Sequence, residues 1–195
     1  MALNAPPENL HDRRLPFATV PGEIYRISRC KYTDPLHWSK KGANRFDAPL
    51  HPYGVLYTAF DPECALVEVF GDVWAQDRVI QPRALDDFEL CTLTVSRPVR
   101  VVDFTGDHLN RLGTDANLFA SLQYELTRQW AEALMNHPER PQGILYHSRK
   151  NPLLYSYALF GTPLTKSAIG VSRRLPLTHY PYLMRILLKY DVALL

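Results

Sequence analysis

Short runs of alternating or strongly apolar residues predict a series of β-strands along the chain. Residues 23–29 (EIYRISR) alternate between apolar and polar positions, which is the period of a half-buried strand. Residues 55–60 are rich in strand-forming types and lead directly into a helical pattern. Four later runs are also strand-like, namely 88–95, 99–104, 143–146 and 155–160.

The helix predicted after residue 60 carries one unusual charge. Asp61 and Pro62 predict its start, because Asp can cap free backbone N–H groups and Pro suits the first helical position. From residue 64 to residue 70 every side chain is apolar except Glu68. Burying a carboxylate without a partner is costly. Glu68 is therefore expected either to pair with a cation or to line a cavity where its charge is used.

A second helix is predicted from Thr114 or Asp115 to the His137–Pro138 step, which ends it. The apolar residues that recur at every fourth position are Leu118, Leu122, Leu126 and Trp130. Residues 182–188 fit either a strand or a short amphipathic helix. The mixed order of strands and helices predicts an α+β fold rather than a regular βαβ sheet.

The chain is expected to form a single domain over residues 23–195, preceded by an N-terminal extension. Residues 1–22 are polar and Pro-rich, which predicts an arm rather than part of the core. Residues 30–53 form a long polar stretch, and a structureless connection of that length inside a domain is usually functional.

Composition excludes several classes of protein. The apolar content of 46% is that of a globular chain, and a net charge of +2 does not by itself indicate nucleic-acid binding. The three cysteines are far apart and form no disulfide framework, which fits a reducing cytoplasm. We expect a cytoplasmic protein, since the sequence shows neither a signal peptide nor a run of membrane-spanning length.

Common catalytic and metal-binding motifs are absent. The sequence contains no GxGxxG, GxxxxGK[ST] or GxSxG motif. The histidines and cysteines show no metal-ligand spacing, so no metal site is expected.

Five side chains are candidate functional residues. They are Arg26, Arg45, Tyr57, Glu68 and Ser148. Each also has a structural interpretation: the arginines as ion pairs, Tyr57 as a core residue, Ser148 as a turn residue and Glu68 as half of a buried pair. The residues alone leave both interpretations open.

Four segments in order resemble the RES domain, a family named for an Arg, a Glu and a Ser. They are EIYRISR followed by NRF at 44–46, GVLYTAFDPECALVEVF, LGTDANLFASLQYELTRQWAEAL, and GILYHSRKN followed by YALF. Arg45, Tyr57 and Glu68 follow one another at intervals of twelve and eleven residues. One departure is that the family usually has two glycines before its Arg, whereas this chain has Ala43 and Asn44.

The resemblance implies a compact ADP-ribosyltransferase-like fold, with two small mixed sheets that form an NAD cleft flanked by helices. It implies NAD as the substrate and cleavage of the nicotinamide–ribose bond, with Glu68, Arg45 and Ser148 as catalytic residues. The residues implied to bind NAD are Tyr25, Arg26, Arg45, Tyr57 and Ser148, with Lys41 and Arg149 as weaker phosphate ligands.

The resemblance also implies a role as the toxin of a toxin–antitoxin pair, neutralised by a helix-turn-helix antitoxin. The acceptor of the ADP-ribosyl group stays open between inorganic phosphate, water and a protein, the last of which would make the chain a mono-ADP-ribosyltransferase. A non-catalytic nucleotide- or protein-binding module is a further alternative. No direct nucleic-acid or membrane partner is expected, and the tail after residue 182 fits either core packing or an oligomer interface.

Overall fold

The computed structural model describes residues 5–48, 53–121 and 124–195. Its strands are β1 Phe17–Thr19, β2 Glu23–Arg29, β3 Val55–Ala59, β4 Val79–Ile80, β5 Phe88–Val95, β6 Arg100–Phe104, β7 Gly143–His147, β8 Tyr155–Phe160, β9 Ile169–Pro176 and β10 Ala193–Leu194. Its helices are α1 Pro62–Asp77, α2 Pro82–Asp86, α3 His108–Leu112, α4 Asn117–Ala120, α5 Glu125–Met135, α6 Pro163–Lys166 and α7 Leu183–Lys189. The predicted α+β class is confirmed.

One mixed sheet organises the described residues, in the order β1-β6-β7-β8-β3-β2-β5-β9. Its neighbours are antiparallel except β6 and β7, and a separate parallel pair joins β4 to β10. The central junction is narrow, because β2 and β3 pair only at Tyr25 and Ala59. The two sheets implied by the resemblance are therefore two halves of one sheet that diverge at this junction.

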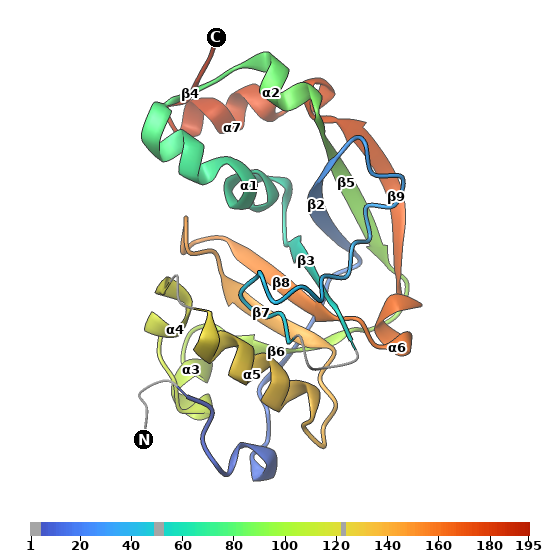
Figure 1. Cartoon of the computed structure of the whole chain (residues 1–195), viewed down its shortest axis with the longest axis vertical. Helices are drawn as coiled ribbons and strands as arrows, with labels where there is room; N and C mark the ends of the chain where they lie inside the picture. The colour runs from blue at the N-terminus through green and yellow to red at the C-terminus, as the bar shows by residue number, and fades with distance from the viewer. Residues whose placement is uncertain (1–4, 49–52, 122–123) are drawn as a thin grey trace.

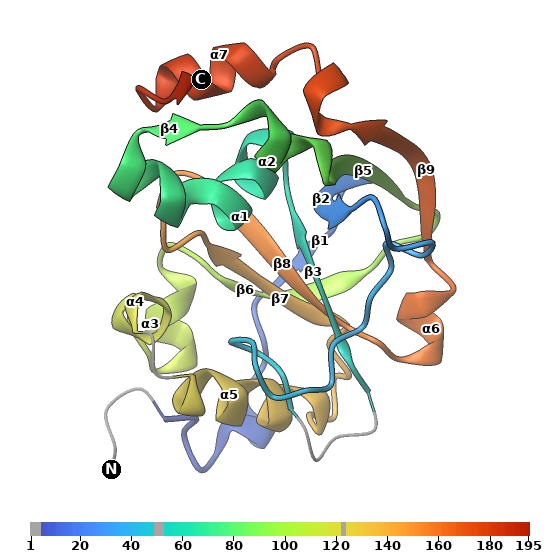
Figure 2. The same cartoon turned by 45° about the horizontal axis from the view of Figure 1, so that its top comes forward.

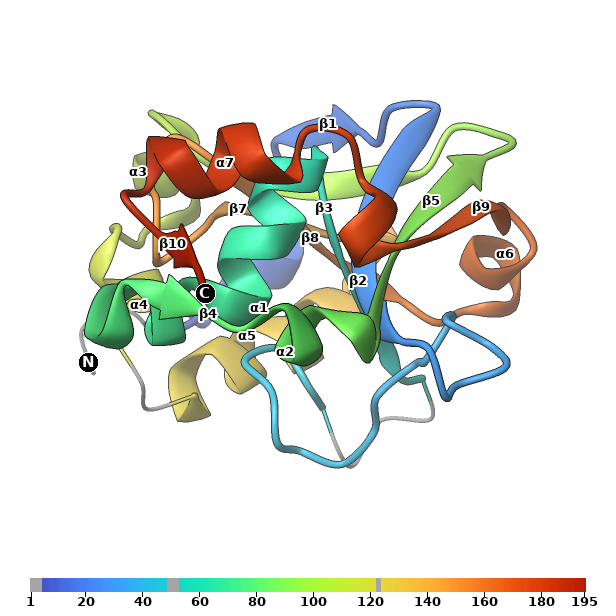
Figure 3. The same cartoon turned by 90° about the horizontal axis from the view of Figure 1, so that it is seen from above.

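Helices cover the two ends of the sheet. Helices α1, α2 and α7 lie at one end, and α3, α4 and α5 lie at the other (Figure 1). Figures 2 and 3 show α7 beside α1, and the two helices share one apolar core. The tail that fitted either a strand or a helix thus forms α7, packed through Leu183, Ile186 and Leu187.

Helix α1 begins where the sequence predicts. The Asp61 carboxylate accepts a hydrogen bond of 2.7 Å from the backbone N–H of Cys64, and Pro62 occupies the first turn. The helix runs to Asp77 and ends with Arg78 in the left-handed region at a φ of 55°. This start places Cys64 and Glu68 one turn apart on the same side of α1.

The N-terminal segment is part of the core, which corrects the expectation of a separate arm for residues 5–22. Leu10, Leu15 and Val20 are buried, and β1 pairs with β6. The Leu15 N–H also donates to the Glu139 carboxylate at 2.8 Å. Scattered apolar residues between prolines are therefore enough to dock this segment.

The single helix predicted over 114–137 is wrong. The described residues form α4 and α5 instead. Helix α4 ends at Ala120, and the backbone of the next residue, Ser121, is extended at a φ of −66° and a ψ of 143°. Leu122, one of the residues that supported the prediction, lies outside the described residues. Trp130 of α5 is fully buried, as its position in the pattern predicts.

Candidate active site

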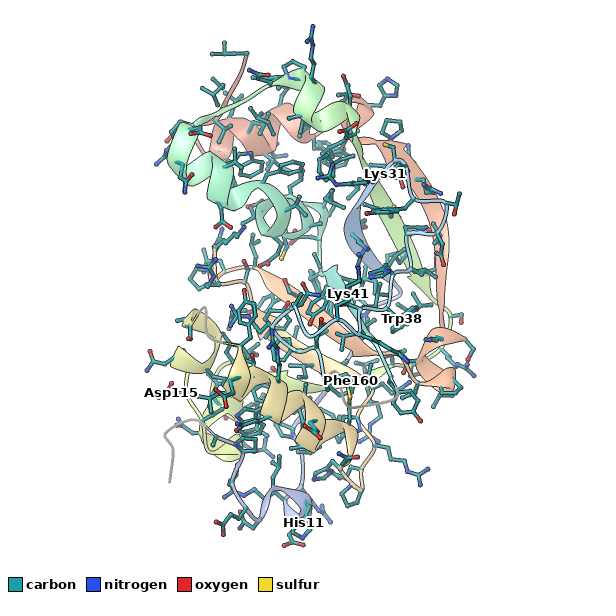
Figure 4. The ribbon with its side chains drawn as sticks, viewed as in Figure 1. His11, Lys31, Trp38, Lys41, Asp115 and Phe160 are labelled. Carbon is teal, nitrogen blue, oxygen red and sulfur yellow. The ribbon has the colours of Figure 1, made fainter. Side chains whose placement is uncertain are left out.

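A cavity of about 670 Å³ lies among α1, the central strands and the loop between β2 and β3. Figure 4 shows Lys41 and Trp38 on this loop, which runs across the face of β3 and β8. Seven of the residues singled out from the sequence line the cavity: Tyr25, Arg26, Lys41, Arg45, Tyr57, Glu68 and Arg149. Ser148 is not among the lining residues.

Glu68 projects from α1 into this cavity. Its Oε1 atom is buried and has no hydrogen-bond partner among the described residues. The Lys150 ammonium reaches the Glu68 backbone carbonyl at 3.0 Å and the Asp72 carboxylate at 3.0 Å rather than the Glu68 side chain. Of the two expectations for Glu68, the structure favours the cavity-lining one.

Arg26 enters the cavity from β2, where the two halves of the sheet diverge. Its Nη1 donates to the Tyr57 carbonyl at 2.9 Å, while its Nε is buried without a partner among the described residues. Burial lowers the pKa of the Arg26 guanidinium. An arginine nevertheless stays charged at neutral pH, because its ordinary pKa is so high.

Arg45 reaches the cavity from the loop between β2 and β3. Its guanidinium lies 4.9 Å from the centre of the Tyr124 ring and donates to the Ser121 carbonyl at 3.2 Å. The backbone carbonyl of Arg45 accepts from Thr127 at 2.6 Å. Contacts with Ser121, Tyr124 and Thr127 therefore hold Arg45 in place.

Tyr57 is fixed by the same loop. Its hydroxyl donates to the Asp47 carboxylate at 2.9 Å and accepts from the Phe46 N–H at 2.9 Å. Burial, with the nearby Asp47 charge, raises the pKa of Tyr57 well above its ordinary value. The hydroxyl is thus engaged within the protein, and the ring lines the cavity.

The remaining predicted ligands lie at the edges of the cavity. The Tyr25 hydroxyl donates to Glu23 at 3.2 Å, and burial raises the pKa of Tyr25. Arg149 lies 3.7 Å from the Asp72 carboxylate. Lys41 is exposed.

Ser148 is buried behind the cavity wall and organises the turn between β7 and β8. Its Oγ accepts hydrogen bonds from the N–H groups of Lys150 at 3.2 Å and Asn151 at 3.4 Å. The structural interpretation of Ser148 as a turn residue therefore matches its contacts, and its catalytic role stays a prediction.

Tyr146 of β7 and Ser156 of β8 are among the lining residues that the sequence did not single out. These residues lie directly opposite each other in the sheet, and Ser156 Oγ is 3.3 Å from the Cys64 sulfur. Burial raises the pKa of Cys64 to about 12, so its thiol is protonated at neutral pH. For Tyr146 the available signal was strand alternation back from Ser148, because residues two apart in a strand share a face.

Within the described ranges, no group of three or more His, Cys, Asp or Glu residues could hold a metal ion. The same ranges contain no helix long and apolar enough to cross a membrane. The cavity brings the Glu68 carboxylate together with the guanidinium groups of Arg26 and Arg45, while Arg149 lies beside Asp72 at its edge. This combination suits an organic ligand with both hydroxyl and anionic groups.

The chain matches the RES domain over residues 23–180, and it belongs to that family. It is similar to a protein of Sinorhizobium fredii (strain NBRC 101917 / NGR234) named probable toxin y4kH, with 30% identity over 67 residues. That match covers 34% of this chain and 53% of the relative, so the chain spans about half the length of this curated relative.

A solved structure shares the fold. The chain is similar to one in the crystal structure of the M. tuberculosis MbcT–MbcA toxin–antitoxin complex, with a TM-score of 0.60 and 17% identity. The likeness covers 88% of this chain and 93% of that chain.

Proposed function

We propose that this chain cleaves the nicotinamide–ribose bond of NAD and acts as the toxin of a toxin–antitoxin pair. One observation carries the catalytic part: a buried acceptor, Glu68 Oε1, and a buried donor, Arg26 Nε, line the same cavity without partners among the described residues. Buried polar groups are nearly always satisfied, so such a pair calls for a ligand. The ribose hydroxyls of NAD are donors and its pyrophosphate is an acceptor.

One carboxylate is sufficient for this chemistry. In NAD the nicotinamide ring is a positively charged pyridinium, and it becomes a neutral molecule when its bond to the ribose breaks. It therefore needs no general acid to protonate it, whereas the leaving oxygen of an ordinary glycosidic bond does. Glu68 holds the ribose and stabilises the positive charge that develops on the sugar carbon as the bond breaks. A carboxylate preset in a poorly hydrated cavity does this without solvent reorganisation.

The two arginines bind the pyrophosphate. A guanidinium gives two parallel hydrogen bonds to phosphate oxygens, which an ammonium group does not. Arg45 is held against Tyr124 and Arg26 against the Tyr57 carbonyl, so both are oriented before the substrate binds. Tyr25 and Tyr57 wall the cavity, and Lys41 and Arg149 are additional cations at its edge. Ser148 stays a predicted ligand of the ribose next to the nicotinamide or of Glu68, and its hydroxyl also holds the turn that carries Arg149.

The toxin role is supported by family membership and by the relatives. The curated relative is named a probable toxin, and the fold is that of a chain in a toxin–antitoxin complex. We extend this to a cognate antitoxin, of the helix-turn-helix type, that binds this chain in the cytoplasm.

Nicotinamide release from NAD by the purified protein tests the proposal, with Glu68→Gln as the matched variant. We expect Glu68→Gln to lower kcat by about 10²- to 10³-fold, because it removes the charge and keeps the shape. Release that needs added inorganic phosphate identifies a phosphorylase, and release without it a hydrolase. Equal rates for both proteins, or no release by the folded wild type, would contradict the catalytic proposal.

Mass spectrometry of cell proteins after exposure to the wild type separates the transferase alternative, since only a transferase leaves ADP-ribose attached to a protein. Measurable NAD binding without nicotinamide release or ADP-ribose transfer would favour a binding module.

A further inference from the structure

We infer that Tyr146 binds the ribose next to the nicotinamide and that Ser156 positions the Tyr146 hydroxyl for this contact. The inference rests on the proposed function and names two residues of the same cavity to which no role was given above. Both residues line the cavity opposite the helix that carries Glu68.

The sheet register places the two residues together. Tyr146 of β7 pairs with Ser156 of β8, and Ser156 in turn pairs with Ala59 of β3. Helix α1 packs against this part of the sheet, where the Cys64 sulfur is 3.3 Å from Ser156 Oγ. Glu68 lies one helical turn beyond Cys64, so its carboxylate faces this part of the sheet.

The Tyr146 hydroxyl lies in the fields of both charged groups that define the site. Burial raises the pKa of Tyr146, the Glu68 charge raises it further, and the Arg45 charge and a hydrogen bond from Ser156 lower it. The phenol is therefore neutral at physiological pH and can both donate and accept a hydrogen bond. A ribose diol has the same dual character, whereas the Glu68 carboxylate is an acceptor only.

The Tyr146 ring is held rigidly. Phe46 packs edge-on at 4.9 Å between ring centres, and Phe119 stacks at 6.0 Å. Ser156 is almost inaccessible, so it acts through Tyr146 rather than on the substrate. Because Phe46 and Phe119 keep the ring in place, Tyr146→Phe removes the hydroxyl while preserving the packing.

The test compares Tyr146→Phe with Tyr157→Phe. Tyr157 is a buried tyrosine of the same strand as Ser156, but it belongs to the core on the other face of the sheet. We expect Tyr146→Phe to raise KM for NAD about 5- to 20-fold with a smaller change in kcat, since the hydrogen bond is made in the ground and transition states alike. Tyr157→Phe keeps the wild-type KM.

NAD analogues that lack the 2′- or the 3′-hydroxyl of the nicotinamide ribose sharpen the test. The wild type discriminates against both analogues, and Tyr146→Phe loses the discrimination against at least one. Ser156→Ala raises KM in the same direction, and combining it with Tyr146→Phe adds nothing further, because it acts through the same hydroxyl. Unchanged discrimination in Tyr146→Phe, or additive effects of the two variants, would overturn the assignment.

Measurement of NAD binding tests the role of Tyr146 separately from the proposed catalytic activity. If the wild type releases no nicotinamide, the Kd for NAD measured by calorimetry still tests the ribose contact. A Kd raised about 5- to 20-fold in Tyr146→Phe but not in Tyr157→Phe supports the ribose contact. Equal Kd values, or no NAD binding by the wild type, overturn it.

Discussion

Asp47 is a buried carboxylate that ties the loop between β2 and β3 to the sheet. Its Oδ1 accepts from the Tyr57 hydroxyl at 2.9 Å. Its Oδ2 accepts from Ser39 Oγ at 2.8 Å and from the backbone and side-chain nitrogens of Asn44 at 3.2 and 3.1 Å. Because Asn44 directly precedes Arg45, these bonds set the backbone from which Arg45 reaches the cavity.

We predict that Asp47→Ala lowers the free energy of unfolding by about 3 kcal/mol, because the buried Ser39 hydroxyl, the half-buried Tyr57 hydroxyl and two nitrogens of Asn44 lose their acceptor at once. Urea unfolding measures the loss. Asp34→Ala is the control: Asp34 is exposed in the same loop and accepts one bond, from the Leu36 N–H at 2.8 Å, so its loss is about 1 kcal/mol or less. Similar stabilities of the two variants would show that the Asp47 bonds contribute little.

At the scale of elements, the start of α1 governs where Glu68 lies. Asp61→Ala removes the side-chain cap on the Cys64 N–H, and we expect it to cost about 1 kcal/mol of unfolding free energy. Asp61→Asn keeps a side-chain oxygen in the same place and is expected to stay close to the wild type. Chemical denaturation of the two variants tests this; an Asn variant as unstable as the Ala variant would rule out capping as the cause.

The sequence predicted most of the strands and the start of α1, because these elements depend on neighbouring residues in the chain. Strands β2, β3, β5, β6, β7 and β8 and the start of α1 follow from alternation, strand-forming residues and a capping pair. The break between α4 and α5 did not follow, because it depends on tertiary contacts such as that between Arg45 and the Ser121 carbonyl. Strand β9 was missed since an exposed edge strand needs little apolar alternation.

Some residues of the candidate site could be predicted from the sequence and others could not. Glu68 was conspicuous because a charge stood in an apolar run, and the arginines and Tyr57 followed from the order of family motifs. That Tyr146 and Ser156 lie side by side depends on which strands are neighbours, and the position of Asp47 depends on how a loop folds back. A single sequence does not specify either property.

At the scale of the whole molecule, the segment before the family match is expected to be essential for folding. We predict that a chain of residues 23–195 does not fold stably, because it loses the buried Leu10, Leu15 and Val20 and the pairing of β1 with β6. One buried Leu→Ala change costs about 2–5 kcal/mol, a large part of a typical domain's stability.

Thermal melting followed by near-UV circular dichroism compares this truncation with the full chain. Leu15→Ala in the full chain should lower the melting temperature, while Glu8→Ala, at an exposed position, should leave it unchanged. A cooperative transition of the truncated chain at the wild-type temperature would mean that the segment contributes no stability.

Strand β9 forms one outer edge of the sheet, and its features affect the tendency of the protein to aggregate at high concentration. An unpaired strand edge is a template for aggregation, and proteins protect such edges with charge, bulges and proline. All three protections occur here: Arg173 is exposed on β9, the register with β5 shifts beside Thr92, and Pro176 ends the strand. Addition of a strand from a second copy of the chain is thus disfavoured at the β9 edge.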